Sequence, residues 1–122
     1  MTVRPESDDV QLERGRGAAE PRRAARGRAV RLTAKGLRPE ADEGPVDLSI
    51  YAPDPHGWTL PGAPAGSPRY RVVVEATLRV RGGRAAYTFR TALKDVPGHY
   101  VALFRRLDCS SRPVARATFE LR

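Results

Sequence analysis

The amino-acid sequence predicts an all-β fold, a small antiparallel β-sandwich of about six to seven strands. Two observations predict this class. Apolar and polar residues alternate with a period of two through most of the chain after residue 28, which is the pattern of strands with one buried face. No segment carries a convincing helical period, and clusters of glycine and proline separate the alternating runs. Two packed antiparallel sheets are therefore favoured over a mixed fold.

The first two predicted strands cover residues 29–35 and 46–52. In the first, Val30, Leu32 and Ala34 alternate with polar residues, and the second repeats the pattern. The segment between them is rich in glycine, proline and charged residues, which suits a turn. We expect these two strands to pair with each other in an antiparallel manner.

A long connection is predicted for residues 53–68. The segment holds five prolines and three glycines, a composition that opposes regular ladders. Loops of this length in compact domains are often binding elements, which makes His56 and Trp58 candidate partner-binding residues. A tryptophan in this place either stacks on a sugar, a base or a partner protein, or folds back to cover the core.

The next two runs predict a β-hairpin. Residues 70–80 alternate without a break, and Gly82 and Gly83 suit a two-residue turn whose central positions want positive φ. With that turn, residues 84–90 return along the first strand, so that Leu78 faces Tyr87.

Two further strands are predicted near the C-terminus. Residues 100–107 are apolar on both faces, as expected of a central strand, whereas residues 114–121 alternate. Six strands result in total, at the spacing of a β-sandwich.

Residues 1–28 are predicted to form a flexible, arginine-rich arm. They contain few aliphatic residues, so burial cannot offset about 1–2 kcal/mol of backbone entropy per ordered residue. The arginines of the second half of the arm are candidate partner-binding residues: Arg14, Arg16, Arg22, Arg23, Arg26 and Arg28. The β-sandwich domain is expected to cover residues 29–122.

The net charge of +8 has two interpretations. Clustered cations gain affinity for phosphates by releasing condensed counterions, which favours nucleic acid or another acidic surface as a partner. However, Lys35 and Lys94 are the only lysines among the 22 basic residues, and alanine, glycine and proline are abundant. The codons of a high-GC bacterium account for the same composition.

Catalytic chemistry has few candidate groups in this sequence. Cys109 can act as a nucleophile only if His56 or His99 comes within hydrogen-bond reach, and a plain loop cysteine is the simpler interpretation. Asp54 and His56 lack the further ligands that a metal site needs. No glycine-rich phosphate loop joins a strand to a helix. We expect a non-enzymatic protein with no catalytic residue, no metal and no cofactor.

Patterns for export and membrane insertion are missing from the sequence. The first residues lack the apolar core and cleavage site of a signal peptide. No run approaches the ~20 apolar residues that cross a bilayer. The single Cys109 cannot form an internal disulfide, which fits a reducing compartment. A cytoplasmic location without a transmembrane segment is expected, and a surface location requires a miscalled start or a longer chain.

Two segments have glycine, proline and tyrosine residues at their predicted turns and strand ends. The first, residues 32–53, has Gly36 and Leu37 at a turn and ends its strand with Tyr51 and Pro53. The second, residues 87–100, begins Tyr87, Thr88, Phe89 and continues through Pro97, Gly98 and His99 to Tyr100. Together they resemble the immunoglobulin-like repeats of actinobacterial surface proteins. The resemblance implies an immunoglobulin-like β-sandwich that serves as a non-catalytic spacer or adhesion module, with no site residues.

Three functional hypotheses follow. The leading one is a non-enzymatic structural or protein-interaction β-sandwich, in which the segment 53–68 and the arm contact a protein partner. The alternative is a nucleic-acid-associated or particle-assembly protein that binds through its basic arm. The third, a small enzyme or ligand-binding barrel, requires a pocket that joins His56, His99 or Cys109. The oligomeric state is left open.

Overall fold

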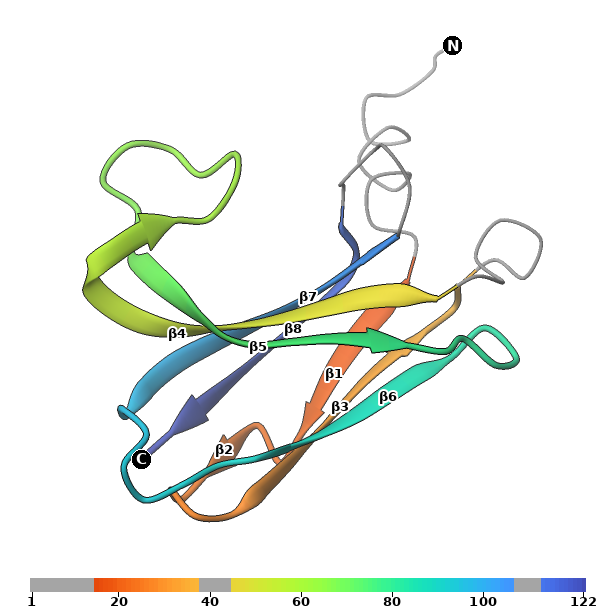
Figure 1. Cartoon of the computed structure of the whole chain (residues 1–122), viewed down its shortest axis with the longest axis horizontal. Coiled ribbons are helices and arrows are strands. Elements are labelled where there is room, and N and C mark those ends of the chain that lie inside the picture. Colours follow the sequence, from red (N-terminus) through yellow and green to blue (C-terminus); the bar gives the residue numbers. More distant parts are fainter. Residues whose placement is uncertain (1–14, 38–44, 107–112) are drawn as a thin grey trace, which may run out of the picture.

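The computed structural model of the chain describes residues 15–37, 45–106 and 113–122, and these contain eight strands and no helix. The strands form two stacked sheets (Figure 1), which confirms the predicted all-β sandwich. The small sheet contains, in spatial order, β1 (Arg16–Glu20), β3 (Ala29–Lys35) and β6 (Ala85–Arg90). The large sheet contains β2 (Arg23–Ala24), β8 (Pro113–Leu121), β7 (Gly98–Arg106), β4 (Val46–Thr59) and β5 (Arg69–Leu78).

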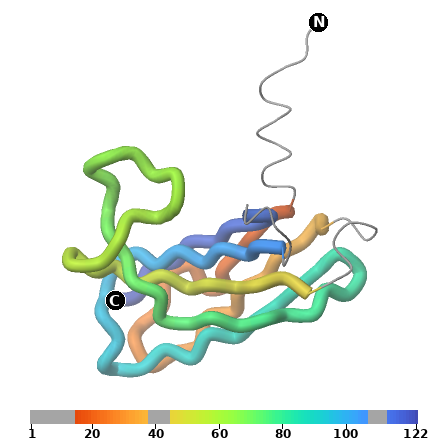
Figure 2. Tube along the Cα trace, turned by 45° about the horizontal axis from the view of Figure 1, so that its top comes forward, coloured from red at the N-terminus to blue at the C-terminus, as the bar shows by residue number. Residues whose placement is uncertain are grey.

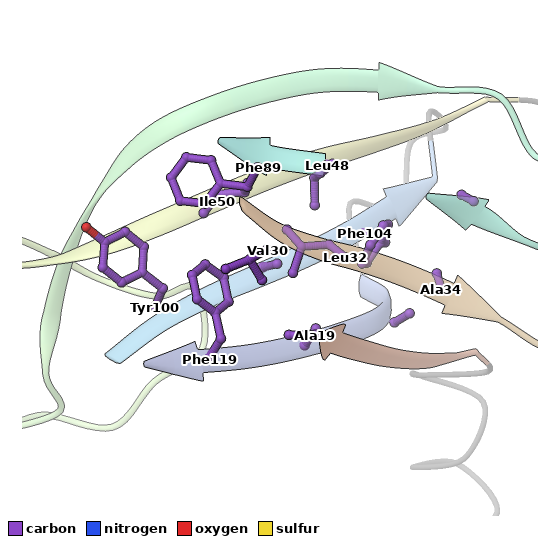
Figure 3. Packing of buried hydrophobic residues seen from close by; sticks show 14 of the residues in the cluster. Ala19, Val30, Leu32, Ala34, Leu48, Ile50, Phe89, Tyr100, Phe104 and Phe119 are labelled. Carbon is purple, nitrogen blue, oxygen red and sulfur yellow. The ribbon is translucent and has the colours of Figure 1, made fainter. Parts of the chain in front are cut away.

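The hydrophobic core lies between the inner faces of the two sheets. Val30 and Leu32 of β3 meet Leu48 and Ile50 of β4, and all four side chains are completely buried (Figure 3). Alternation along each strand places these residues on one face, as the period of two predicts. Burial of such side chains is the main stabilising term of the fold.

Three aromatic rings close one end of the core. Phe89 lies 6.1 Å from Tyr100 and 6.0 Å from Phe119, and the rings of Tyr100 and Phe119 are stacked at 5.2 Å (Figure 3). The hydroxyl of Tyr100 donates a hydrogen bond to the carbonyl of Val96 at 2.7 Å. This bond ties the start of β7 to the backbone just upstream of it.

The environment of Tyr100 changes the acidity of its hydroxyl. Burial, aided by the negative charge of Asp95, raises the pKa of Tyr100 above its ordinary value of 10.0, and Arg71 and Arg26 oppose that effect. Desolvation penalises the tyrosinate, so the folded protein favours the neutral phenol.

The predicted strands are present, but two predicted pairings are wrong. The strands at 29–35 and 46–52 lie in different sheets, since β3 pairs with β1 and β6 whereas β4 pairs with β5 and β7. The predicted hairpin keeps its tight turn, with Arg81 and Arg84 bonded to each other across Gly82 and Gly83. Beyond that turn the two strands separate, β5 into the large sheet and β6 into the small one. The chain therefore changes sheets at the turn.

The prediction of a flexible arm over residues 1–28 is wrong for the described part, residues 15–28. β1 forms an antiparallel ladder with β3, and β2 pairs with β8 in parallel. Pro21 separates the two strands, and a proline cannot donate to a ladder. Ala19 and Ala24 are buried in the core despite their small size. Neighbouring strands supply the backbone partners that an isolated arm lacks, which offsets the cost of ordering it.

The two C-terminal strands agree with the sequence pattern. Residues 100–104 of β7 are buried on both faces, as predicted for a strand with neighbours on each side. In β8, Ala115, Ala117, Phe119 and Leu121 face the core. The part of the chain that the structure describes contains no helix able to cross a membrane.

Candidate functional site

The outer end of β4 and β5 projects beyond the body of the sandwich as a hairpin (Figure 2). β4 continues to Thr59, so the predicted loop over residues 53–68 is limited to residues 60–68. Two turns shape that loop, closed by hydrogen bonds from Ala63 N to Leu60 O and from Ser67 N to Pro64 O. The prolines of residues 53–59 are accommodated because β4 is irregular there.

The irregularity is a bulge of four residues in β4. Pro53 and Trp58 both pair with Tyr70 of β5, which leaves residues 54–57 outside the ladder. The Asp54 carboxylate accepts a hydrogen bond from the backbone N–H of His56 at 2.9 Å and forms an ion pair with Arg71 at 3.8 Å. Such side-chain-to-backbone bonds hold a chain in a turn. The two contacts of Asp54 therefore hold the bulge in its shape.

Gly57 allows the bulge to close onto β5. A Cβ at this position would overlap the carbonyl oxygen of Tyr70, so the two backbones approach each other more closely than any other residue permits. The next residue, Trp58, is thereby placed directly opposite Tyr70.

Trp58 points into solvent with 81% of its surface exposed, and it does not cover the core. Val72 of β5 is 45% exposed, and Tyr51 and Tyr70 are half-buried. Val72 pairs with Tyr51, as Trp58 does with Tyr70. Directly paired residues project from the same side of a sheet. Tyr51, Trp58, Tyr70 and Val72 therefore form one apolar surface on the outside of the large sheet, the hairpin surface.

The alternation of apolar and polar residues in the sequence does not predict that Tyr70 and Val72 lie on this surface. The unbroken alternation of residues 70–80 assigns both to the core, but the ladder shifts between Val72 and Val74. Val73 and Val74 both pack against the core, so the strand changes face at this point. The only signal in the sequence is the run of three valines, where alternation of polarity stops.

Arg105 fixes Tyr51 within the hairpin surface. Its guanidinium donates a hydrogen bond to the Tyr51 hydroxyl at 3.3 Å. A tyrosine held by such a bond loses less side-chain freedom when a partner covers it.

The two histidines among the predicted chemical groups lie on different strands. His56 is exposed in the bulge, whereas His99 lies on β7, and Cys109 is outside the described residues. Within the three described ranges, no three His, Cys, Asp or Glu side chains group closely enough to hold a metal ion.

The arginines of the predicted arm are divided among several faces. Arg14 lies outside the described residues, and Arg16 is exposed on β1 of the small sheet. Arg22 and Arg23 line an open depression of about 550 Å³ together with His99, Thr118, Phe119 and Glu120.

The other arm arginines have structural contacts. Arg23 forms an exposed ion pair with Glu120 at 3.4 Å. The Arg26 side chain donates to the carbonyl of Arg122 at 3.0 Å, and the Arg28 carbonyl accepts a bond from Thr91 at 2.6 Å. These residues therefore do not form one continuous basic arm.

Comparison with known proteins finds likeness only among solved structures. No family model matches the chain, and no curated protein matches it. The chain is similar to the alkylpurine DNA glycosylase AlkC of Pseudomonas fluorescens, solved bound to DNA containing an abasic site analog, at 17% identity and a TM-score of 0.46. That match covers 90% of this chain but only 31% of the glycosylase chain.

A second solved structure is the soluble domain of PmoD from Methylocystis sp. ATCC 49242 (Rockwell). The match has 16% identity and a TM-score of 0.47, and covers 83% of this chain and 78% of that chain. At these values neither similarity bears on function. The resemblance to actinobacterial immunoglobulin-like repeats stays a prediction.

Proposed function

We propose that this protein is a non-enzymatic, immunoglobulin-like β-sandwich that binds a protein partner through the hairpin surface. The observation that carries the proposal is Trp58, which is 81% exposed on a strand rather than folded onto the core. Tryptophan and tyrosine are enriched among the residues that dominate binding energy at protein interfaces. An exposed tryptophan beside two tyrosines and a valine has the composition of such a centre.

The immunoglobulin-like assignment is supported by the strand arrangement. A sheet of β1, β3 and β6 packs on a sheet containing β4, β7 and β8, and the chain crosses between the sheets after β1, β2, β3, β5 and β6. These crossings resemble Greek-key connections, and the Tyr100 contact resembles a tyrosine corner.

The partner is expected to offer an apolar pocket with polar groups around it. Around the hairpin surface lie polar side chains, among them His56, Arg69 and the ion pair of Asp54 with Arg71. An apolar centre with a polar rim is the usual anatomy of a protein interface. Trp58 and Tyr70 are held by the ladder before binding, so little ordering cost remains.

Partner capture with the full chain tests this proposal. Tagged wild-type, Trp58→Ala and Leu93→Ala proteins are compared, and captured proteins are identified and quantified. Leu93 is the matched control because it is 78% exposed but lies between β6 and β7, away from the hairpin surface. A true partner loses affinity by about 30-fold or more with Trp58→Ala, the effect of a central interface residue, and is unchanged by Leu93→Ala. If no captured protein depends on Trp58, the proposal is wrong.

A further inference from the structure

The outer face of the small sheet carries three rows of residues that cross the strands. The register pairs Arg16 with Lys35, and its continuation beyond the pair Ala34 and Ala85 places Arg84 opposite Lys35. The second row contains small residues, Ala18, Thr33 and Ala86. The third row contains Glu20, Arg31 and Thr88. The face thus has a low middle row between two rows of longer side chains.

These rows enclose a cavity of about 330 Å³. Ala18, Thr33 and Ala86 form its floor, and Arg31, Lys35 and Arg84 stand along its walls with Glu20. Rows that are two residues apart along a strand are separated by about 6.6 Å, so the walls stand about 13 Å apart. We call this feature the basic trough.

The positive charges of the basic trough outnumber its one described carboxylate, Glu20, which lies opposite Arg31 in the register. Arg16, Arg31, Lys35 and Arg84 are exposed, and none forms an ion pair with another described residue. Like charges directly opposite each other on neighbouring strands destabilise a sheet. The row of Arg16, Lys35 and Arg84 therefore gains stability when an anion covers it.

A ligand in the basic trough can be held only by side chains. The trough crosses the strands, and the middle strand, β3, is hydrogen-bonded to β1 on one side and to β6 on the other. A peptide in the trough therefore cannot add to the sheet as a further strand. The lining residues include no aromatic or large apolar side chain to select a base or an apolar residue.

We propose that the basic trough binds the phosphodiester backbone of nucleic acid without sequence preference. Guanidinium groups match phosphate oxygens with two parallel hydrogen bonds, and arginine is the main cation here. Contacts to phosphates position a protein on nucleic acid but carry no sequence information. The trough lies on the opposite side of the sandwich from the hairpin surface, so this site is independent of the proposed protein partner.

The test is the salt dependence of binding to a short DNA duplex of mixed sequence, measured by fluorescence anisotropy with the full chain. The trough variant carries Arg31→Gln, Lys35→Gln and Arg84→Gln. The control variant carries Arg79→Gln, Lys94→Gln and Arg122→Gln, three exposed cations that do not line the trough. Both variants lose the same net charge. Circular dichroism confirms that each is folded.

We expect the trough variant, but not the control variant, to lose affinity for the duplex. Three lost phosphate contacts reduce the slope of log affinity against log salt by about 2.7 and the affinity at ~0.1 M salt by on the order of 10²-fold. The single variant Lys35→Gln reduces the slope by about 0.9. The control variant keeps a slope close to that of the wild type.

Three outcomes overturn the proposal. Equal losses in the trough and control variants mean that the net charge of +8 alone drives binding. No binding to the duplex at low salt removes nucleic acid as the ligand. Binding of poly-glutamate with higher affinity than the duplex, lost in the trough variant, identifies an acidic protein segment as the ligand instead.

Discussion

Gly17 of β1 lies directly against the backbone of Arg116 in β8. A Cβ at Gly17 would overlap the carbonyl oxygen of Arg116, so this contact requires glycine. Nearby, the N–H of Gly15 donates to the carbonyl of Val114 at 2.7 Å. These contacts join the small sheet to the large sheet along one side of the sandwich.

Replacement of Gly17 by alanine is expected to destabilise the protein. The added methyl group must push β1 away from β8, and such overpacking costs about 1–3 kcal/mol. Urea denaturation gives the free energy of unfolding. Ala18→Ser, on the exposed face of the same strand, is the control and is expected to change stability by about 0.5 kcal/mol or less. Equal stability of Gly17→Ala and wild type would show that β1 does not pack on β8 in solution.

Thr91, at the start of the turn after β6, is expected to contribute to the stability of the protein. Its buried hydroxyl accepts a hydrogen bond from Gly27 N at 2.8 Å and donates one to Arg28 O at 2.6 Å. Thr91→Val keeps the shape but removes the acceptor of Gly27 N and leaves Arg28 O with only the bond from Thr91 N at 3.3 Å, which costs about 1–3 kcal/mol. Thr91→Ser keeps the hydroxyl and should recover most of the loss in thermal denaturation. A valine variant as stable as the serine variant would contradict this role.

Tyr100→Phe is expected to lower stability at neutral pH by about 0.5–1.5 kcal/mol, because the bond to Val96 is lost. The difference in stability between the wild type and Tyr100→Phe should shrink at alkaline pH. The folded pKa is raised above 10.0, so the wild type keeps the contribution of its neutral phenol below pH 10 and loses it as pH rises through the folded pKa. Unfolding curves of both proteins from neutral to alkaline pH measure the difference. A gap that widens above pH 10 would be the wrong sign.

Gly57→Ala is expected to rearrange the bulge beneath Trp58. The new methyl group meets the carbonyl of Tyr70 and forces the two strands apart. Trp58 is the only tryptophan, so the fluorescence of the protein reports this site alone. The wild type should show the emission of a water-exposed indole, and the variant should show changed quenching by acrylamide. A blue-shifted wild-type spectrum would mean that Trp58 is covered.

The positions of six strands after residue 28 were predictable from the sequence, but their partners were not. Alternation of Val30, Leu32 and Ala34 identifies a strand with one buried face whichever strand lies beside it. In the same way, Gly82 and Gly83 specify a tight turn but do not require the flanking strands to remain paired. β5 and β6 join opposite sheets, and the local pattern does not report that choice.

The candidate site was predictable only in part. Trp58 and His56 were selected by composition, and the structure places both on the projecting hairpin. Tyr70 and Val72 were missed because a bulge reverses the face of β5. The small apolar side chains of residues 15–28 predict an arm, yet Ala19 and Ala24 fill the core where neighbouring backbones are close. Deletion of residues 1–28 therefore removes two strands rather than a tail.

The parallel pairing of β2 with β8 gives the protein a direction of mechanical resistance. Three backbone hydrogen bonds join the segments, from Glu120 N to Arg22 O at 2.8 Å, from Arg122 N to Ala24 O at 3.0 Å and from Arg26 N to Arg122 O at 3.3 Å. Tension applied at Arg22 and at Arg122 pulls these two parallel strands in opposite directions along their length. The load then falls in shear on all three bonds at once.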